Sequence, residues 1–168
     1  TIEGEEGDAG NEYASGDKPS LRLPGLQQEL LEKITAIGKP VILVVLAGSA
    51  MDLSWADKNV DAIIDAWYPG ARGGRAVAEL IFGDYSPSGK LPVTFYEDET
   101  ELPEFTDYSM SNRTYRYSKA RALYPFGYGL KYTDIEYSGE TLDRSCASVG
   151  DEITISAQVS NNGTYDVN

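Results

Sequence analysis

The chain has 168 residues, of which 41% are hydrophobic, and this is enough to bury the core of a folded domain. Its 27 acidic and 14 basic residues give a formal net charge of −13, which repels nucleic-acid phosphates and anionic lipids, so neither nucleic acid nor a membrane is expected as a partner. With one cysteine and no histidine, the chain excludes an internal disulfide, a Ser-His-Asp triad, a Cys-His pair and a histidine-ligated zinc site.

The first part of the chain predicts a loop, a helix and a strand. Residues 1–20 are acidic and rich in glycine, without a periodic apolar face, and predict a loop of a length that is more often functional than idle. Apolar residues then recur at helical spacing between Pro24, which suits a helix start, and Gly38, which suits a C-terminal cap. The unbroken aliphatic run 41–46 is typical of a parallel strand covered on both faces.

The middle of the chain continues this alternation. Residues 62–67 predict a second strand and residues 73–82 a second helix, so the fold class expected is α/β, with an open, mostly parallel sheet flanked by helices in an α/β sandwich. A turn-rich connector at 83–90 leads to a further predicted strand at 91–96. Residues 102–137 are aromatic and irregular, which is typical of a segment that wraps over a neighbouring surface.

The character of the sequence changes near residue 138. Apolar and polar residues alternate from 153 to 159, which predicts a strand with one wet face, and the turn Asn161–Gly163 follows it. We interpret this as the opening of a β-sandwich that the chain does not complete. Two domains are therefore expected, at 1–137 and 138–168.

No segment suggests a membrane span or an export signal. The longest apolar run, residues 41–47, is far shorter than the ~20 residues that cross a bilayer. No basic-then-apolar segment opens the chain, which begins at Thr1, so a cytoplasmic and a secreted bacterial location both stay open.

Three stretches of the sequence carry a resemblance to a known family. They are Ala66-Trp67-Tyr68-Pro69-Gly70 running on through Gly73-Gly74 to Phe82-Gly83-Asp84-Tyr85-Ser86-Pro87-Ser88-Gly89-Lys90-Leu91-Pro92, then Asp107-Tyr108-Ser109-Met110 with Arg113-Thr114-Tyr115-Arg116-Tyr117, and Leu123-Tyr124-Pro125-Phe126-Gly127-Tyr128-Gly129-Leu130. In this order they resemble the second domain of glycoside hydrolase family 3, closest to its β-xylosidase-like branch, over residues 1–137. Residues 138–168 are similar to the start of the fibronectin type III-like domain that often follows.

The same residues also have a folding interpretation. Pro69 and Gly70 end a strand with a turn, and Gly83 stops a helix, so most of the first stretch serves packing. The aromatic stretch 124–129 resembles a sugar-stacking surface, but we interpret it as an interdomain clasp.

The resemblance implies a retaining β-glycosidase, of β-xylosidase or β-glucosidase type, that hydrolyses terminal β-linked xylose or glucose. Such enzymes use one carboxyl group as general acid/base and a second as nucleophile. In family 3 the nucleophilic aspartate lies on a preceding barrel domain, which this chain lacks, so the chain alone is expected to be inactive. The implied partners are the barrel domain of the same enzyme and a β-linked oligosaccharide or glycoside; no cofactor or metal is implied, and a homodimer is left open.

The acid/base of the family is a glutamate on a loop of this domain, followed by Gly-x-Asp-Arg and then Leu-x-Leu-Pro. In this chain the segment Gly16-Asp17-Lys18 and the segment Leu21-Arg22-Leu23-Pro24 match the downstream part, and Glu5 aligns best with the acid/base. Glu3 and Glu6 stay as alternates, because the spacing to Asp17 is long and Lys18 replaces the arginine. Crowded carboxylates raise one another's pKa, which favours a protonated acid near neutrality.

Other polar residues could contact the sugar. The substrate-binding candidates are Asp17, Lys18, Ser109 and Met110, with Asp107 and Tyr108 beside the last two. Two other interpretations stay open. The glutamates could form a solvated acidic loop, and the chain could be a non-catalytic structural or carbohydrate-binding domain derived from the same family.

Overall fold

The computed structural model describes residues 2–3, 20–104 and 106–166. The chain divides into two compact units. The first unit comprises residues 1–78 and 90–128, and the second comprises residues 79–89 and 129–168.

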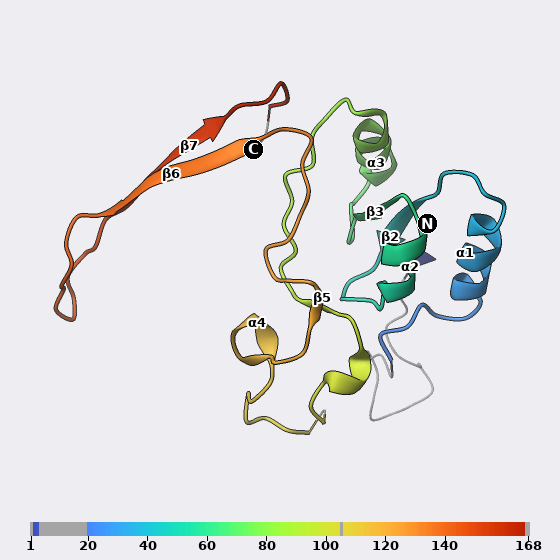
Figure 1. Ribbon diagram of the computed structural model, residues 1–168, viewed down its shortest axis with the longest axis horizontal. Helices are drawn as coiled ribbons and strands as arrows, with labels where there is room; N and C mark the ends of the chain where they lie inside the picture. The colour runs from blue at the N-terminus through green and yellow to red at the C-terminus, as the bar shows by residue number, and fades with distance from the viewer. Residues whose placement is uncertain (1, 4–19, 105, 167–168) are drawn as a thin grey trace. The chain divides into compact units, whose positions relative to one another are not determined.

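A three-stranded parallel sheet forms the centre of the first unit (Figure 1). Its strands are β1 (Ile2–Glu3), β2 (Ile42–Leu46) and β3 (Ala62–Asp65), in the order β1-β2-β3. The two predicted parallel strands are therefore confirmed. The prediction of a loop throughout residues 1–20 was wrong at β1, because a strand of two residues is too short to show a periodic pattern.

Three helices accompany these strands: α1 (Gln27–Thr35), α2 (Ser54–Asn59) and α3 (Gly73–Phe82). The predicted helices are confirmed as α1 and α3, whereas α2 was not predicted. Asp52 initiates α2 through its Oδ1 atom, which accepts hydrogen bonds from the Ser54 N–H at 3.0 Å and the Ser54 hydroxyl at 2.6 Å. No helix in the described part of the chain has both the length and the apolar character needed to cross a bilayer.

The hydrophobic core of the first unit gathers around one face of β2. Burial alternates along this strand: Leu43 and Val45 are buried, whereas Ile42 is exposed. The prediction that β2 is covered on both faces was wrong, because Ile42 is exposed and Val44 and Leu46 are only partly buried. The buried core residues are Leu23, Leu31, Leu43, Val45, Ala47, Met51, Leu53, Ala56 and Phe95.

The predicted strand at 91–96 is shorter than expected. Only β4 (Phe95–Tyr96) is a strand, and it pairs antiparallel with β5 (Ala122–Tyr124) in a separate two-stranded sheet. Leu91 is instead tied to the aromatic segment, donating to Tyr128 O at 2.8 Å and accepting from Gly127 N at 2.8 Å. Between β4 and β5 lie the 3₁₀ helix η1 (Glu99–Glu101) and the short helix α4 (Thr114–Tyr117).

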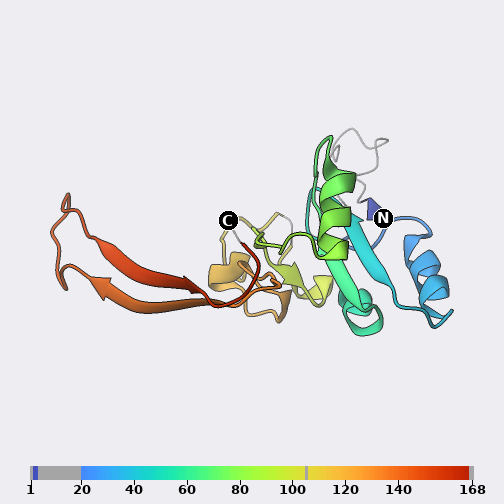
Figure 2. The same cartoon turned by 90° about the horizontal axis from the view of Figure 1, so that it is seen from above.

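The second unit is dominated by an antiparallel strand pair, β6 (Ile135–Leu142) and β7 (Ile155–Asn161). Figure 2 shows the pair as a long two-stranded ribbon. The predicted alternating strand is confirmed as β7. One face of this strand was expected to be exposed, but its apolar side chains are exposed as well, so both faces are open to solvent. The expected domain boundary at 137/138 falls inside β6 and stays a prediction.

Candidate functional site

The carboxyl edge of the parallel sheet is the first candidate site. Glu3 pairs with Leu46 and Asp65 pairs with Val45, so β1, β2 and β3 end at the same edge. Ligands of open parallel sheets bind at the carboxyl ends of the strands. We name residues 3–19 the glutamate segment, because they hold all three candidate acid/base residues, and this segment continues directly from β1.

Most of the predicted site residues lie outside the described residues. Glu5, Glu6, Asp17 and Lys18 belong to this group, and the structure describes only the backbone of Glu3, as the last residue of β1. The structure therefore fixes where the glutamate segment leaves the sheet, and its assignments stay predictions.

Asp65 places a buried carboxyl group at this edge. Its Oδ1 atom accepts a hydrogen bond from the Trp67 N–H at 3.3 Å, while its Oδ2 atom is buried without a hydrogen-bond partner among the described residues. Burial raises the pKa of Asp65 from 3.8 to about 6, and the hydrogen bond from Trp67 offsets part of this rise. Asp65 can therefore hold a proton in mildly acidic solution, unlike an ordinary surface aspartate.

An aromatic turn follows Asp65 at the same edge. Trp67 has a positive φ of 49° and packs edge-on against Phe95, with ring centroids 6.4 Å apart. The exposed ring of Tyr68 lies over Gly48, where an added Cβ would be 2.5 Å from the Tyr68 Oη. Gly48 follows β2 closely, so its missing side chain leaves the space that the ring occupies.

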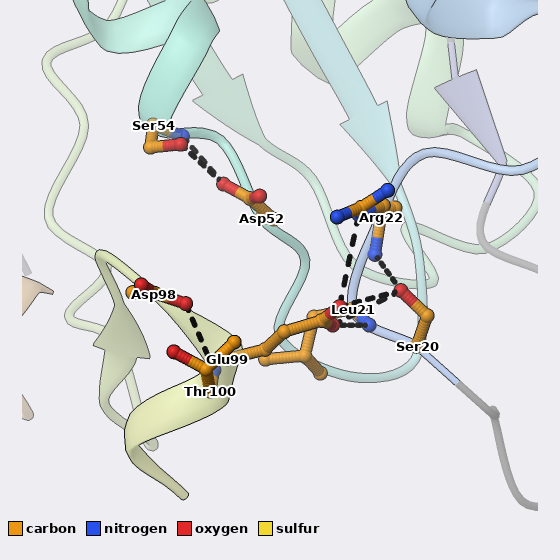
Figure 3. A network of polar contacts seen from close by, with 8 residues as sticks. All are labelled: Ser20, Leu21, Arg22, Asp52, Ser54, Asp98, Glu99 and Thr100. Atoms are coloured by element: carbon orange, nitrogen blue, oxygen red, sulfur yellow. Dashed lines mark hydrogen bonds and ion pairs between the residues drawn. The ribbon is translucent and has the colours of Figure 1, made fainter.

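A polar network fixes the chain immediately after the glutamate segment (Figure 3). The carboxylate of Glu99 accepts hydrogen bonds from the Ser20 hydroxyl, at 3.1 Å to Oε1 and 3.0 Å to Oε2, and from the Leu21 N–H at 2.7 Å to Oε2. The Leu21 carbonyl accepts a 2.6 Å hydrogen bond from the Asp52 N–H. Both backbone groups of Leu21 are therefore held by residues distant in sequence.

A charged groove lies beside this network, with a volume of about 450 Å³. Arg22 and Arg121 reach its carboxylates: Arg22 Nε lies 3.7 Å from Glu99 Oε1, and Arg121 Nε lies 3.2 Å from Glu97 Oε2. Both arginines are exposed, so these ion pairs stabilise the fold little. The lining residues are Arg22, Asp52, Glu97, Asp98, Glu99, Thr100, Glu101 and Arg121.

Ser109 and Met110, the other predicted substrate-binding residues, lie on an exposed turn. Asp107 Oδ1 accepts the Ser109 N–H at 2.9 Å, which lowers the pKa of Asp107 below its usual range. Arg113 holds the turn by donating from Nε to Asp107 O at 2.9 Å. Met110 has a positive φ of 62°, a conformation that a non-glycine residue adopts only where its surroundings enforce it.

One side chain connects this turn to the groove. Asn112 Nδ2 donates to the Glu101 carbonyl at 3.2 Å, and Asn112 Oδ1 accepts from the Lys119 N–H at 2.6 Å. No sequence pattern pointed to Asn112, Glu99 or Asp65, since their partners are distant in sequence or are backbone groups. Among the described residues, no group of three or more histidine, cysteine, aspartate or glutamate side chains could hold a metal ion.

Comparison with known proteins decides the family. The family model described as "Glycosyl hydrolase family 3 C-terminal domain" matches residues 1–132. The chain belongs to glycosyl hydrolase family 3. The predicted resemblance is therefore confirmed, and the observed α/β fold, with its helices and small sheets, is that of the family 3 C-terminal domain.

The proteins to which this chain is similar include β-xylosidases and β-glucosidases. A "Xylan 1,4-beta-xylosidase" of Xylanibacter ruminicola is 46% identical over 165 residues, which cover 98% of this chain and 19% of that protein. A "Periplasmic beta-glucosidase" of Salmonella typhimurium is 33% identical over 166 residues, covering 92% of this chain and 22% of that protein. The chain thus spans about a fifth of the length of these relatives.

Solved structures of the family agree in fold. A β-glucosidase of Erythrobacter marinus superposes with a TM-score of 0.73 at 38% identity, covering 89% of this chain and 20% of that one. A β-D-glucoside glucohydrolase of Trichoderma reesei gives a TM-score of 0.83 at 23% identity, covering 96% of this chain and 27% of that one, and shows the fold alone. The chain therefore matches a fifth to about a quarter of the length of these two solved structures.

Proposed function

We propose that this chain supplies the general acid/base of a retaining β-glycosidase that hydrolyses terminal β-linked xylose or glucose. The nucleophilic aspartate would lie on a barrel domain outside this chain, and the chain alone would be inactive. The observation that carries the proposal is that the described residues on both sides of residues 4–19 are held: β1 pairs with β2 at the carboxyl edge of the sheet, and Glu99 binds Ser20 and Leu21.

The proposed chemistry needs two carboxyl groups with different tasks. One donates a proton to the departing glycosidic oxygen, and the other attacks the sugar carbon to form a glycosyl-enzyme that water then hydrolyses. Retention requires the two groups to lie about 5 Å apart, so each domain has to present its carboxyl group at a defined place. Attachment of the chain on both sides of a catalytic residue favours such a defined place.

Glu5 is the proposed general acid/base, with Glu3 and Glu6 as alternates. Asp17 and Lys18, from the same segment, and Ser109 and Met110, from the turn tethered to η1, are the proposed sugar contacts. In this arrangement the hydroxyl groups of the sugar would find hydrogen-bond donors and acceptors on both segments. Names of relatives that include "beta-xylosidase" and "beta-glucosidase" support the substrate class.

The test is a series of Glu3→Gln, Glu5→Gln and Glu6→Gln in this chain joined to its barrel domain. The acid/base variant should lose about 10²- to 10⁴-fold in kcat on a poorly activated alkyl β-xyloside, because the leaving oxygen departs without a proton. A dinitrophenyl β-xyloside, which needs no protonation, should be affected far less, and azide should restore turnover.

Glu12→Gln is the matched control, since Glu12 lies in the same segment outside the glutamate cluster. It should leave both rates unchanged. Wild-type kinetics in all three cluster variants would exclude the proposed role for this segment. A β-glucoside series run in parallel would decide between the two sugars.

A second function, carbohydrate binding without catalysis, is favoured by one observation. Tyr115 and Phe126 stack with ring centroids 4.4 Å apart and interplanar angle 15°, both are exposed, and the Arg116 guanidinium lies 5.8 Å from the Tyr115 ring. Exposed aromatic faces can bind the apolar faces of sugar rings. Calorimetric titration of this chain with xylo-oligosaccharides tests it, and Tyr115→Ala should abolish any binding at this surface.

The domain organisation also stays a proposal. We propose that the α/β domain comprises residues 1–137 and that residues 138–168 open a fibronectin type III-like domain. The antiparallel pairing of β6 with β7 supports this, since such domains are built from antiparallel strands.

A further inference from the structure

Helix α3 ends in a pattern of hydrogen bonds within its own backbone. The Gly83 N–H donates to the Leu80 carbonyl at 3.1 Å, and the Asp84 N–H donates to the Glu79 carbonyl at 2.8 Å. Gly83 has a positive φ of 77°, a conformation in which glycine commonly ends a helix. We name residues 79–89, which belong to the second unit, the α3 end. The first part of this segment therefore has a defined backbone conformation.

Tyr132 makes two hydrogen bonds to the α3 end. Its N–H donates to the Ser86 hydroxyl oxygen at 2.9 Å, and its own hydroxyl group donates to the Leu80 carbonyl at 3.1 Å. Leu80 is in the last turn of α3, where helix carbonyls need partners from outside the helix. Ser86 is 9% exposed, so the loss of its hydroxyl group would leave the Tyr132 N–H without a partner in a place that water hardly reaches.

Tyr165 adds a third contact to the same segment. Its ring packs edge-on against Tyr132, with centroids 5.9 Å apart, and its Oη lies 3.4 Å from the position that a Cβ on Gly83 would take. Tyr132 precedes β6 and Tyr165 follows β7, so both lie beside the pair Ile135–Asn161, at which the two strands meet. We name residues 132–135 and 161–165 together the ribbon base.

The ribbon base is held together by its own side chains. The Thr133 hydroxyl donates to Asn161 Oδ1 at 2.7 Å, and Asn161 Nδ2 donates to the Tyr165 carbonyl at 2.7 Å. A Cβ on Gly163 would lie 2.0 Å from Thr133 Oγ1, so a side chain at this position would collide with Thr133. The start of β6, the end of β7 and the Tyr165 backbone are therefore connected to one another.

The ribbon formed by β6 and β7 buries little beyond this base. An isolated two-stranded pair is at best marginally stable in water, and the apolar side chains of this pair are exposed. Among the described residues of the second unit, only Ser86 and Thr133 are buried, one in the α3 end and one in the ribbon base. Stability of the ribbon beyond that of its own ladder therefore comes from the contact between these two segments.

We propose that the α3 end is the docking site on which the C-terminal ribbon folds. Residues 79–89 and 129–166 unfold and refold as one cooperative unit, and the ribbon loses its order when its base leaves the α3 end. This gives the turn-rich connector at 83–90 a role in binding the C-terminal residues of the chain. The inference goes beyond the proposed function and does not depend on it.

Amide hydrogen exchange of this chain tests the inference. Tyr132→Ala removes the hydrogen bond to Leu80 and the ring contact with Tyr165. Exchange should accelerate by about 10-fold or more in β6 and β7 and also at Gly83, while the amides of β2 keep their protection. Tyr132→Phe keeps the ring and should fall between Tyr132→Ala and wild type.

Tyr137→Ala is the matched control for these variants. Tyr137 is a 65% exposed tyrosine of β6 that pairs with Val159 beyond the ribbon base. Its loss should leave the exchange of the Gly83 amide unchanged. If Tyr132→Ala accelerates exchange at Gly83 no more than Tyr137→Ala does, the two segments are not one cooperative unit and the inference is wrong.

A second variant tests the same coupling from the other segment. Ser86→Ala removes the acceptor of the Tyr132 N–H, so exchange in β6 and β7 should again accelerate by about 10-fold or more. Ser88→Ala, at an exposed position of the same loop, should leave both strands unchanged. Acceleration by Ser86→Ala that stays within residues 79–89 would overturn the inference. Equal acceleration in β2 would overturn it as well, because the two segments would then unfold only with the whole chain.

Discussion

Strands β2 and β7 both contain β-branched apolar residues, yet these side chains differ in burial. Val45 of β2 is 1% exposed, whereas Val159 of β7 is 59% exposed. The difference does not come from the strands themselves: Val45 belongs to a buried cluster with Leu31, Met51 and Phe95, which come from distant parts of the chain. An apolar pattern thus predicts which face of a strand can be buried, and the segments that pack on this face decide whether it is buried.

The largest effect on stability is expected from a substitution in the core that packs on β2. Phe95 is 1% exposed and contacts the rings of Trp67 and Tyr124 at centroid distances of 6.4 and 6.2 Å. Phe95→Ala should lower the free energy of unfolding of the first unit by about 3–5 kcal/mol, since it leaves a cavity and removes both ring contacts. Urea unfolding followed by tryptophan fluorescence measures this.

Phe82→Ala is the control for this prediction, because Phe82 is 82% exposed. It should change the free energy of unfolding by no more than about 0.5 kcal/mol. Equal losses in the two variants would mean that Phe95 is not the centre of the core.

The comparison of β2 with β7 also explains how much of the fold was predictable from the sequence. The strands at β2 and β3 and the helices α1 and α3 were predicted because each has a continuous or periodic apolar pattern that requires no knowledge of partners. The helix α2 was missed because its sequence, Ser54–Asn59, is short and polar. Its one local signal was Asp52, two residues before the helix and able to bond Ser54.

The site was less predictable than the fold, for a related reason. Glu99 and Asp65 owe their roles to burial and to partners that the fold supplies, so their sequence contexts resemble those of ordinary acidic residues. Leu91–Thr94 was predicted as strand because its composition fits one, but Pro92 cannot donate a ladder hydrogen bond and only residues 95 and 96 find a partner strand. Local sequence patterns predict local structure, whereas the contacts of Glu99, the burial of Asp65 and the pairing of β4 with β5 depend on the fold.

A smaller effect is expected at Asp65. Its pKa of about 6 in the folded chain is above the ordinary value of 3.8, so the folded state binds a proton more tightly than the unfolded state. Stability is therefore lost as pH rises from about 4 to 6. Asp65→Asn should be more stable than wild type at pH 7 by about 1 kcal/mol, after allowance for solvent screening, and should match it at pH 4.

Asp107→Asn is the control, because the pH dependence expected for the stability contribution of Asp107 has the opposite sign to that of Asp65. The pKa of Asp107 is lowered by the hydrogen bond from Ser109, so its carboxylate stabilises the fold above the unfolded pKa and this contribution disappears as pH falls. Thermal unfolding from pH 4 to pH 7 measures both variants. An Asp65→Asn difference from wild type that does not grow with pH would exclude a buried, proton-holding carboxyl group.

The smallest expected effect is at Val159, on the exposed ribbon. Val159 pairs with Tyr137, and Ile155 pairs with Leu142. Leu142 would face the other side in a regular ladder, but the register shift between Ser138 and Thr141, at Gly139 with φ 64°, places it on the same face as Tyr137. The bulge thus assembles one continuous apolar face without covering it.

Val159→Ala should therefore cost less than about 0.5 kcal/mol in this chain, whereas Val45→Ala should cost about 2 kcal/mol for the same atoms removed. Amide hydrogen exchange in β7 and β2 measures each change where it occurs. If residues 138–168 open a fibronectin type III-like domain, further strands would cover this face. The cost of Val159→Ala in a longer polypeptide should then rise toward that of Val45→Ala, and a cost that stays near zero there would contradict the proposed sandwich.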